Sequence, residues 1–186
     1  MPPKIKISKE DVISATIDLV RKGGKNQINA RAIASYLNCS TQPIFSNFSS
    51  MDELMIAVFE RADEISRNYV NSEIEKGEFP VYKANGMAYI RFAKEEKELF
   101  KLLYMTRIRE ENLAFQTNSW NQMKKLVQNN TGLSEDTAHL FHLEMWAFVH
   151  GIASMFATSF LDLDWDLVSK MLTDAYLGLK TQYEGR

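Results

Sequence analysis

The sequence predicts an all-α protein, and three observations support this fold class. Apolar residues recur at helical spacing along almost the whole chain, and no segment alternates apolar and polar residues between turn signals as a strand would. Serine, asparagine or aspartate precedes most of these segments, where its side chain can cap a helix. Glycine or proline interrupts the pattern between several of them. We therefore expect a small N-terminal helical domain over residues 1–50 and a helical bundle over residues 51–186.

The composition is that of a folded protein rather than of a disordered or fibrous chain. The 186 residues are 45% hydrophobic and 25% charged, with only four Pro and eight Gly. The single cysteine, Cys39, cannot form a disulfide within the chain, and the start of the sequence does not fit a secretory signal. Both observations favour a cytoplasmic location.

Charge is distributed unevenly along the chain. Residues 1–50 hold seven Lys/Arg against three Asp/Glu, a net charge of +4, whereas residues 51–186 hold fifteen against twenty-one, a net charge of −6. This asymmetry predicts that an N-terminal surface meets an anion while an acidic body stays away from it.

Three helices are expected in the N-terminal domain. The first covers about residues 8–23 and opens on a capping box. The second covers about residues 29–37 with Asn29 as its N-cap, and the third covers about residues 41–47 with Ser40 as its N-cap. Two short helices separated by a few residues after a longer helix predict a helix-turn-helix.

Longer helices are expected in the rest of the chain. A capping-box start at residues 50–53 opens a fourth helix that continues to about residue 76. Asp164 is expected to cap a last helix that ends near residue 183. Helices between these two are predicted over residues 80–95, 97–106 and 110–129, and across an apolar stretch at residues 137–163.

The third helix has side chains suited to reading DNA. The major groove is about 12 Å wide and admits one helix, whose short polar side chains can reach base edges. Ile44 and Phe48 are expected to anchor this helix in the core, and Gln42 can bond adenine through two hydrogen bonds. Spacing alone leaves open a small bundle with a polar third helix. Donors and acceptors are supplied by Thr41, Gln42, Ser46 and Asn47.

Residues 29–54 resemble the DNA-binding signature of the TetR family of bacterial regulators. The shared pattern is a polar cap, an Ile-Ala pair, a turn of small residues, an aromatic-x-x-Phe pair and an acidic-Leu start to the fourth helix. The resemblance implies a homodimer that binds a double-stranded DNA operator and responds to a small-molecule effector. The residues expected to contact DNA are Lys6, Asn29, Arg31, Thr41, Gln42, Pro43, Phe45, Ser46 and Asn47.

Two positions depart from the family pattern. Phe45 stands where the family usually has a Tyr that bonds phosphate, and Met51 stands where it often has a Lys. We expect the basic residues ahead of the first helix, or Arg31 in the second, to compensate for these lost phosphate contacts. A solvated surface charge is the alternative interpretation of Arg31.

Residues 140–161 are apolar almost all the way round a helix. The length suits a membrane span, but Glu144 and two histidines within it, and the lack of a flanking basic cluster, argue against one. We expect one side to meet the chain's own core through Trp146, Val149 and Ala153, and another to meet a second copy. The expected dimer interface comprises Ala147, Gly151, Ser154 and Thr158, with Val168, Leu172, Ala175 and Leu179 from the last helix.

Residues 146–151 resemble the Trp-x-x-x-His-Gly signature of WHG-type C-terminal domains in the same family. His150 has two interpretations: a buried histidine satisfied by a neighbouring carbonyl or carboxylate, or a polar anchor in an effector pocket. The spacing of the three histidines does not favour a metal site. The residues expected to line an effector pocket are Tyr89, Phe92, Leu103, Tyr104, Trp120, Met123, Trp146 and His150.

The sequence contains no catalytic constellation. It has no Glu-x-x-His pair, no Gly-rich phosphate loop and no nucleophile motif, so we expect no enzyme and no cofactor. The function predicted is that of a ligand-responsive repressor. The alternative is a helical interaction protein whose DNA-binding surface has weakened, which Phe45 and Met51 suggest.

Overall fold

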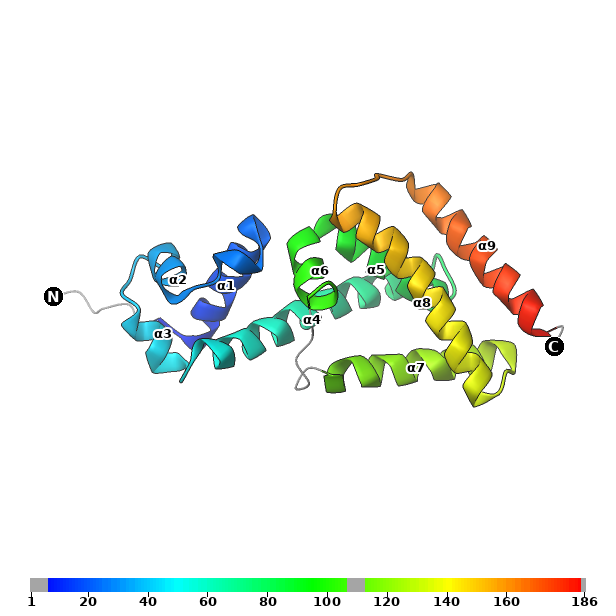
Figure 1. Ribbon diagram of the computed structural model, residues 1–186, viewed down its shortest axis with the longest axis horizontal. Coiled ribbons are helices and arrows are strands. Elements are labelled where there is room, and N and C mark those ends of the chain that lie inside the picture. The colour runs from blue at the N-terminus through cyan, green and yellow to red at the C-terminus, as the bar shows by residue number, and fades with distance from the viewer. Residues whose placement is uncertain (1–6, 107–112, 185–186) are drawn as a thin grey trace. The chain divides into compact units, whose positions relative to one another are not determined.

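The computed structural model describes residues 7–106 and 113–184, and within these ranges it contains helices and no strand (Figure 1). The all-α prediction is confirmed. Most helix ends lie within a few residues of those expected, but the helix expected across residues 137–163 ends at Ala157. The elements are α1 (Lys9–Gly23), η1 (Lys25–Gln27), α2 (Ala30–Tyr36), α3 (Gln42–Asn47), α4 (Met51–Glu75), α5 (Val81–Glu95), α6 (Lys97–Tyr104), α7 (Leu113–Thr131), α8 (Glu135–Ala157) and α9 (Trp165–Glu184).

The chain folds as two compact units. Unit 1 comprises residues 1–67 and 96–106, and unit 2 comprises residues 68–95 and 107–186. Unit 1 therefore contains α1–α3, most of α4 and, from later in the chain, α6. The boundaries of these compact units differ from those of the functional domains expected at 1–50 and 51–186. The reason is that α4 and α6 supply part of the core beneath the short helices. The assignment of functions to those two ranges stays a prediction.

Local capping explains where the N-terminal helices begin. The Ser8 hydroxyl accepts a hydrogen bond from the Asp11 N–H at 3.1 Å, and the Asp11 carboxylate accepts one from the Ser8 N–H at 2.8 Å, so the predicted capping box is confirmed. Asn29 caps α2 through the Ala32 N–H at 2.9 Å, also as predicted. The prediction that Ser40 caps α3 is wrong. Thr41 is the N-cap, in helical conformation and without a side-chain cap.

The core of unit 1 is formed by apolar side chains from every one of its α-helices. Ile44 and Phe48, predicted to anchor the third helix, are at most 1% exposed. Burying an aliphatic or aromatic side chain of this size contributes about 1.5–3 kcal/mol. The other large buried side chains of this core are Val12, Ile17, Val20, Ile33, Leu54, Val58, Leu99, Phe100 and Leu102.

Helix α4 runs unbroken from Met51 to Glu75, as predicted. The Ser50 hydroxyl accepts from the Glu53 N–H at 3.1 Å, as in a capping box. The reciprocal bond is displaced by one residue, because the Glu53 carboxylate accepts from the N–H of Ser49 at 2.7 Å.

Unit 2 is built around α8, which packs against α5, α7 and α9. Ser134 caps α8 through the Thr137 N–H at 3.3 Å. Asp164 caps α9 through the Asp166 N–H at 2.9 Å, as predicted. Among the helices described, α8 is the one long and apolar enough to cross a membrane by length and composition. Its buried face serves as core for unit 2 and carries Phe141, Met145, Val149, Ile152, Ala153 and Phe156.

Candidate functional site

The outward side of α3 is formed by a small number of side chains. Gln42 and Ser46 are exposed, and the Phe45 ring is 51% exposed. Thr41 and Pro43 are half-buried. The helix therefore presents an amide, a hydroxyl and an aromatic ring, and no charge.

Several of the polar groups predicted to read DNA are engaged within unit 1. The Asn47 amide donates to the carbonyls of Ile7 at 3.1 Å and Pro43 at 2.8 Å. The Ser46 hydroxyl donates to the Gln42 carbonyl at 2.9 Å, and the Asn29 amide oxygen serves as a helix cap. Asn47 thus ties the end of α3 to the segment before α1, a structural role that the sequence analysis did not foresee.

Positive charge in this region comes from outside α3. The sequence has no Lys or Arg between Arg31 and Arg61. Arg31 is exposed at the start of α2. Lys9 contacts Glu53 at 3.6 Å and lies 4.8 Å from the centre of the Phe48 ring, and Lys6 lies outside the described residues. Arg31 is thus the exposed cation nearest in sequence to α3 that the structure describes.

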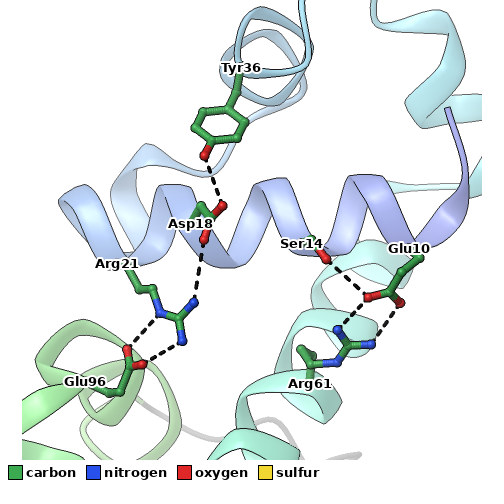
Figure 2. A network of polar contacts seen from close by, with 7 residues as sticks. All are labelled: Glu10, Ser14, Asp18, Arg21, Tyr36, Arg61 and Glu96. Atoms are coloured by element: carbon green, nitrogen blue, oxygen red, sulfur yellow. Dashed lines mark hydrogen bonds and ion pairs between the residues drawn. The ribbon is translucent and has the colours of Figure 1, made fainter. Parts of the chain in front are cut away.

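A network of polar contacts ties α1 to the helices around it (Figure 2). Arg61 of α4 donates to both carboxylate oxygens of Glu10, at 2.6 and 2.8 Å. At the other end of α1, Arg21 donates to both oxygens of Glu96, at 2.9 and 2.6 Å. The hydrogen bond from Arg61 lowers the pKa of the Glu10 carboxyl. Both pairs have the bidentate geometry that makes Arg–carboxylate contacts directional.

The middle of α1 holds α2 through the same network. The Tyr36 hydroxyl donates to Asp18 at 3.0 Å, and Arg21 also contacts Asp18 at 3.6 Å. Because α2 packs on α1, and α1 is bound at both ends, the network fixes the frame that carries α3. These partners lie up to 75 residues apart in sequence, so no local pattern revealed them.

Unit 2 contains two tyrosine–histidine pairs between α5 and α8. The Tyr82 hydroxyl lies 2.9 Å from Nδ1 of His142, and the Tyr89 hydroxyl lies 2.9 Å from Nδ1 of His150. A phenol therefore bonds Nδ1 of His150, a partner that the sequence analysis did not consider.

Two tryptophans extend these pairs into a larger group. The Trp120 indole N–H donates to Nδ1 of His139 at 3.1 Å, and its ring centre lies 4.5 Å from that of His142. The Trp146 ring stacks on His150, with centres 5.0 Å apart and planes at 22°. We call these seven residues the aromatic–imidazole cluster: Tyr82, Tyr89, Trp120, His139, His142, Trp146 and His150.

Burial keeps the buried part of this cluster uncharged. It lowers the pKa of His142 to about 4, with a smaller contribution from the charge of His139, and it lowers the pKa of His150. It also raises the pKa of the Tyr82 hydroxyl. Because an indole N–H can only donate, Nδ1 of His139 is the acceptor of the bond from Trp120. The cluster offers aromatic faces and neutral polar groups.

The predicted effector residues do not all lie together. Tyr89, Trp120, Trp146 and His150 join the cluster, and Met123 is half-buried on α7. Trp146 was expected in the core, but it is 39% exposed because it lies beside the buried stripe of α8.

The other three predicted effector residues lie elsewhere. Phe92 has no exposed surface and packs edge-on against Tyr69, which makes it a core residue. Leu103 and Tyr104 belong to unit 1. The Tyr104 hydroxyl lies 3.2 Å from that of Ser66, and burial raises its pKa to about 12.

Sequence reasoning did not place Tyr82, His139 or His142 in an effector site. The three-residue spacing of the histidines put both on α8, but no signal indicated that Tyr82 would meet one of them from α5. No group of three His, Cys, Asp or Glu residues within the described ranges is arranged to hold a metal ion.

The predicted dimer residues separate into two sets. The first set lies on one side of α8, where Ala147 and Thr158 are exposed and Gly151 and Ser154 are half-buried. The neighbouring apolar side chains of Leu140, Leu143 and Phe148 are also exposed. A Cβ added at Gly151 would meet nothing within 4 Å.

The predicted residues of α9 face largely inward. Val168 and Leu172 are at most 3% exposed, and a Cβ at Gly86 would lie 3.0 Å from Leu172, so both belong to the core of unit 2. Ala175 and Leu179 pack half-buried against the same unit. Val168 and Leu172, which the sequence analysis assigned to an interface, therefore lie in the core, because the apolar stripe of α9 covers α5 and α8. The exposed side of this helix carries Leu167, Asp174, Leu177, Gly178 and Thr181.

Comparison with known proteins identifies what this fold resembles. The family model described as the tetracyclin repressor-like C-terminal domain matches residues 82–175, about half of the chain. No curated protein matches the chain.

Solved structures share the fold along nearly the full length. A TetR-like transcriptional regulator from Rhodococcus sp. RHA1 has a TM-score of 0.71 at 14% identity, with 95% of this chain and 96% of that chain covered. A putative TetR-family regulator from Vibrio parahaemolyticus has a TM-score of 0.67 at 13% identity, with 91% and 97% covered. The multidrug binding protein EbrR, complexed with malachite green, has a TM-score of 0.64 at 18% identity, with 93% and 98% covered.

Proposed function

Because the chain belongs to the tetracyclin repressor-like family of transcriptional regulators, we propose that it is a ligand-responsive repressor that binds a pseudo-palindromic operator as a cytoplasmic homodimer. The observation that carries the DNA-binding part is the outward side of α3, with Gln42 and Phe45 exposed on a helix whose other side is buried. An α-helix of this kind fits the major groove.

The frame around α3 supports this role. Base contacts need a helix held in one orientation, and the network of Figure 2 binds α1 to α2, α4 and α6 at three points. Arg31 is proposed as the phosphate contact that compensates for Phe45 and Met51. The basic segment ahead of α1, including Lys6, is proposed as a second source.

We expect Gln42→Ala and Arg31→Ala to weaken DNA binding in different ways. Gln42→Ala should cost about 1–3 kcal/mol on the operator and little on random DNA, because the amide reads a base. Arg31→Ala should weaken binding to all sequences alike and lower the salt slope by about one. Footprinting on the DNA beside the protein's own gene, followed by titrations at several salt concentrations, measures both.

Lys125→Ala is the matched control, since it removes an exposed positive charge from α7 in unit 2. Its affinity should equal that of the wild type. No protection by the wild-type protein at low salt would refute the repressor proposal and favour the helical interaction protein.

The homodimer is proposed to form through the exposed sides of α8 and α9, which pack against each other in unit 2. On α8, Leu140, Leu143, Ala147 and Gly151 recur at spacings of three and four residues and so lie on one side. On α9, Leu177 is 54% exposed beside Gly178, and a Cβ at Gly178 would meet nothing within 4 Å. Two such helices from each copy would make an isologous four-helix interface.

Ala147→Lys is expected to yield monomers, because it buries an unpaired charge in the centre of the proposed interface. Sedimentation velocity of the wild-type and variant proteins measures the effect. Asn129→Lys, which adds the same charge at an exposed site on α7, should leave the dimer intact. A dimeric Ala147→Lys protein would remove this side of α8 from the interface.

The effector is proposed to contact Tyr89, Trp120, Trp146 and His150. These residues combine aromatic faces with uncharged hydrogen-bonding groups, which suits a small organic molecule. A related fold, EbrR, is complexed with malachite green. The effector would favour one state of α4, and a coupling of ~1–3 kcal/mol would lower operator affinity several-fold or more. A ligand that releases DNA without changing the fluorescence of Trp120 and Trp146 would contradict this location.

A further inference from the structure

Gln42 and Phe45 are the side chains of α3 best placed to distinguish bases. Ile44 is buried, the Ser46 hydroxyl donates to the helix itself, and the Asn47 amide donates to Ile7 and Pro43. The exposed Gln42 amide and the exposed Phe45 ring remain. They stand three residues apart and therefore on the same side of the helix.

The chemistry of α3 excludes the commonest contacts to G·C pairs. Guanine is read mainly by Arg or Lys at O6 and N7, and cytosine by a carboxylate at N4. The helix carries none of these side chains, and no Lys or Arg occurs between Arg31 and Arg61.

Phe45 points to a particular base. Its ring is 51% exposed, and a ring at this position gains free energy only where it meets an apolar surface. On the base edges of the major groove, the apolar group is the C5 methyl of thymine. The amide of Gln42, in turn, matches N6 and N7 of adenine.

We propose that each operator half-site places neighbouring A·T pairs under α3, with Gln42 bonded to an adenine and the Phe45 ring packed on the methyl group of a thymine. The inference rests on the proposed DNA-binding function and adds the sequence class of the operator. Phe45 is thus a specificity-determining residue, which gains a base contact where a Tyr hydroxyl would bond phosphate.

Single-atom changes in the operator test the two contacts separately. In the footprinted fragment, each thymine is replaced in turn by deoxyuridine, which removes only the methyl group. Wild-type protein should lose about fourfold in affinity at one thymine of each half-site, the value of one buried methyl group. Each adenine is likewise replaced by 7-deaza-adenine, and loss of the N7 acceptor should cost roughly tenfold at an adjacent position.

The protein variants assign each effect to its residue. Phe45→Ala should abolish the sensitivity to deoxyuridine and keep the sensitivity to 7-deaza-adenine, whereas Gln42→Ala should do the reverse. Both side chains are exposed, and thermal melting by circular dichroism should show that both variants fold as the wild type does.

The possible failures are distinguishable. If the wild-type protein binds no DNA at low salt, the proposed function and this inference both fall. If it binds DNA but tolerates deoxyuridine at every thymine, or if Phe45→Ala keeps the sensitivity, the inference alone is overturned.

Discussion

Replacement of Arg91 by methionine is expected to destabilise unit 2 by about 1–3 kcal/mol, because it removes one of the two cations that lie beside the buried Glu73 carboxylate. The Glu73 side chain is 1% exposed, and its Oε2 lies 2.8 Å from Lys76 Nζ and 3.4 Å from Arg91 Nε. Oε1 has no hydrogen-bond partner in the part of the chain that the structure describes. The Arg91 guanidinium also lies 4.6 Å from the centre of the Trp165 ring.

Urea unfolding followed by circular dichroism measures this loss, and two further variants show its cause. The double variant Glu73→Gln, Arg91→Met should recover most of the stability, because it removes the buried charge together with its partner. Lys94→Met removes a cation from the same helix, but its partner Asp162 is exposed, so it should cost less than 1 kcal/mol. This account would be contradicted if Arg91→Met were as stable as Lys94→Met. It would also be contradicted if the double variant were no more stable than Arg91→Met.

Acidification is expected to destabilise the protein through His142 by up to ~3 kcal/mol. Burial lowers its pKa from 6.5 to about 4 in the folded protein. As the pH falls, His142 is therefore protonated near pH 6.5 in the unfolded chain but only near pH 4 in the folded protein. The contribution of His142 to the free energy of unfolding is fully present above pH 6.5. It decreases as the pH falls from 6.5 to about 4 and does not change further below pH 4.

His142→Asn isolates this contribution, because the asparagine amide can hydrogen-bond the Tyr82 hydroxyl in place of Nδ1 and does not titrate. The groups facing His142 are Tyr82 and Trp120, with His139 one turn away, and all three stay in the variant. Carboxyls whose pKa is lowered, such as Glu10 and Glu135, destabilise both proteins equally in acid. The variant should lose ~3 kcal/mol less between pH 7 and pH 4, measured by urea titration. Parallel curves would contradict the assignment.

The distance in sequence between interacting residues separates what was predictable from what was not. The capping box at Ser8, the Asn29 cap and the Asp164 cap join residues two or three positions apart. Periodicity and composition within a helix are equally local, so helix positions and the burial of Ile44 and Phe48 followed from the sequence. The one misplaced cap, at Ser40, fell in a tight turn where neighbouring residues compete for the same role.

By itself, then, the amino-acid sequence determined the helices, their order and the helix-turn-helix with its uncharged third helix. Only the tertiary structure decided which side of each helix is free. It turned Val168 and Leu172 into the core, left Trp146 partly exposed and brought Tyr82 to His142 across 60 residues. It also engaged the Asn47 amide with the Ile7 carbonyl. The physical reason is that helical periodicity shows that a helix has an apolar stripe, whereas packing selects which neighbour covers it.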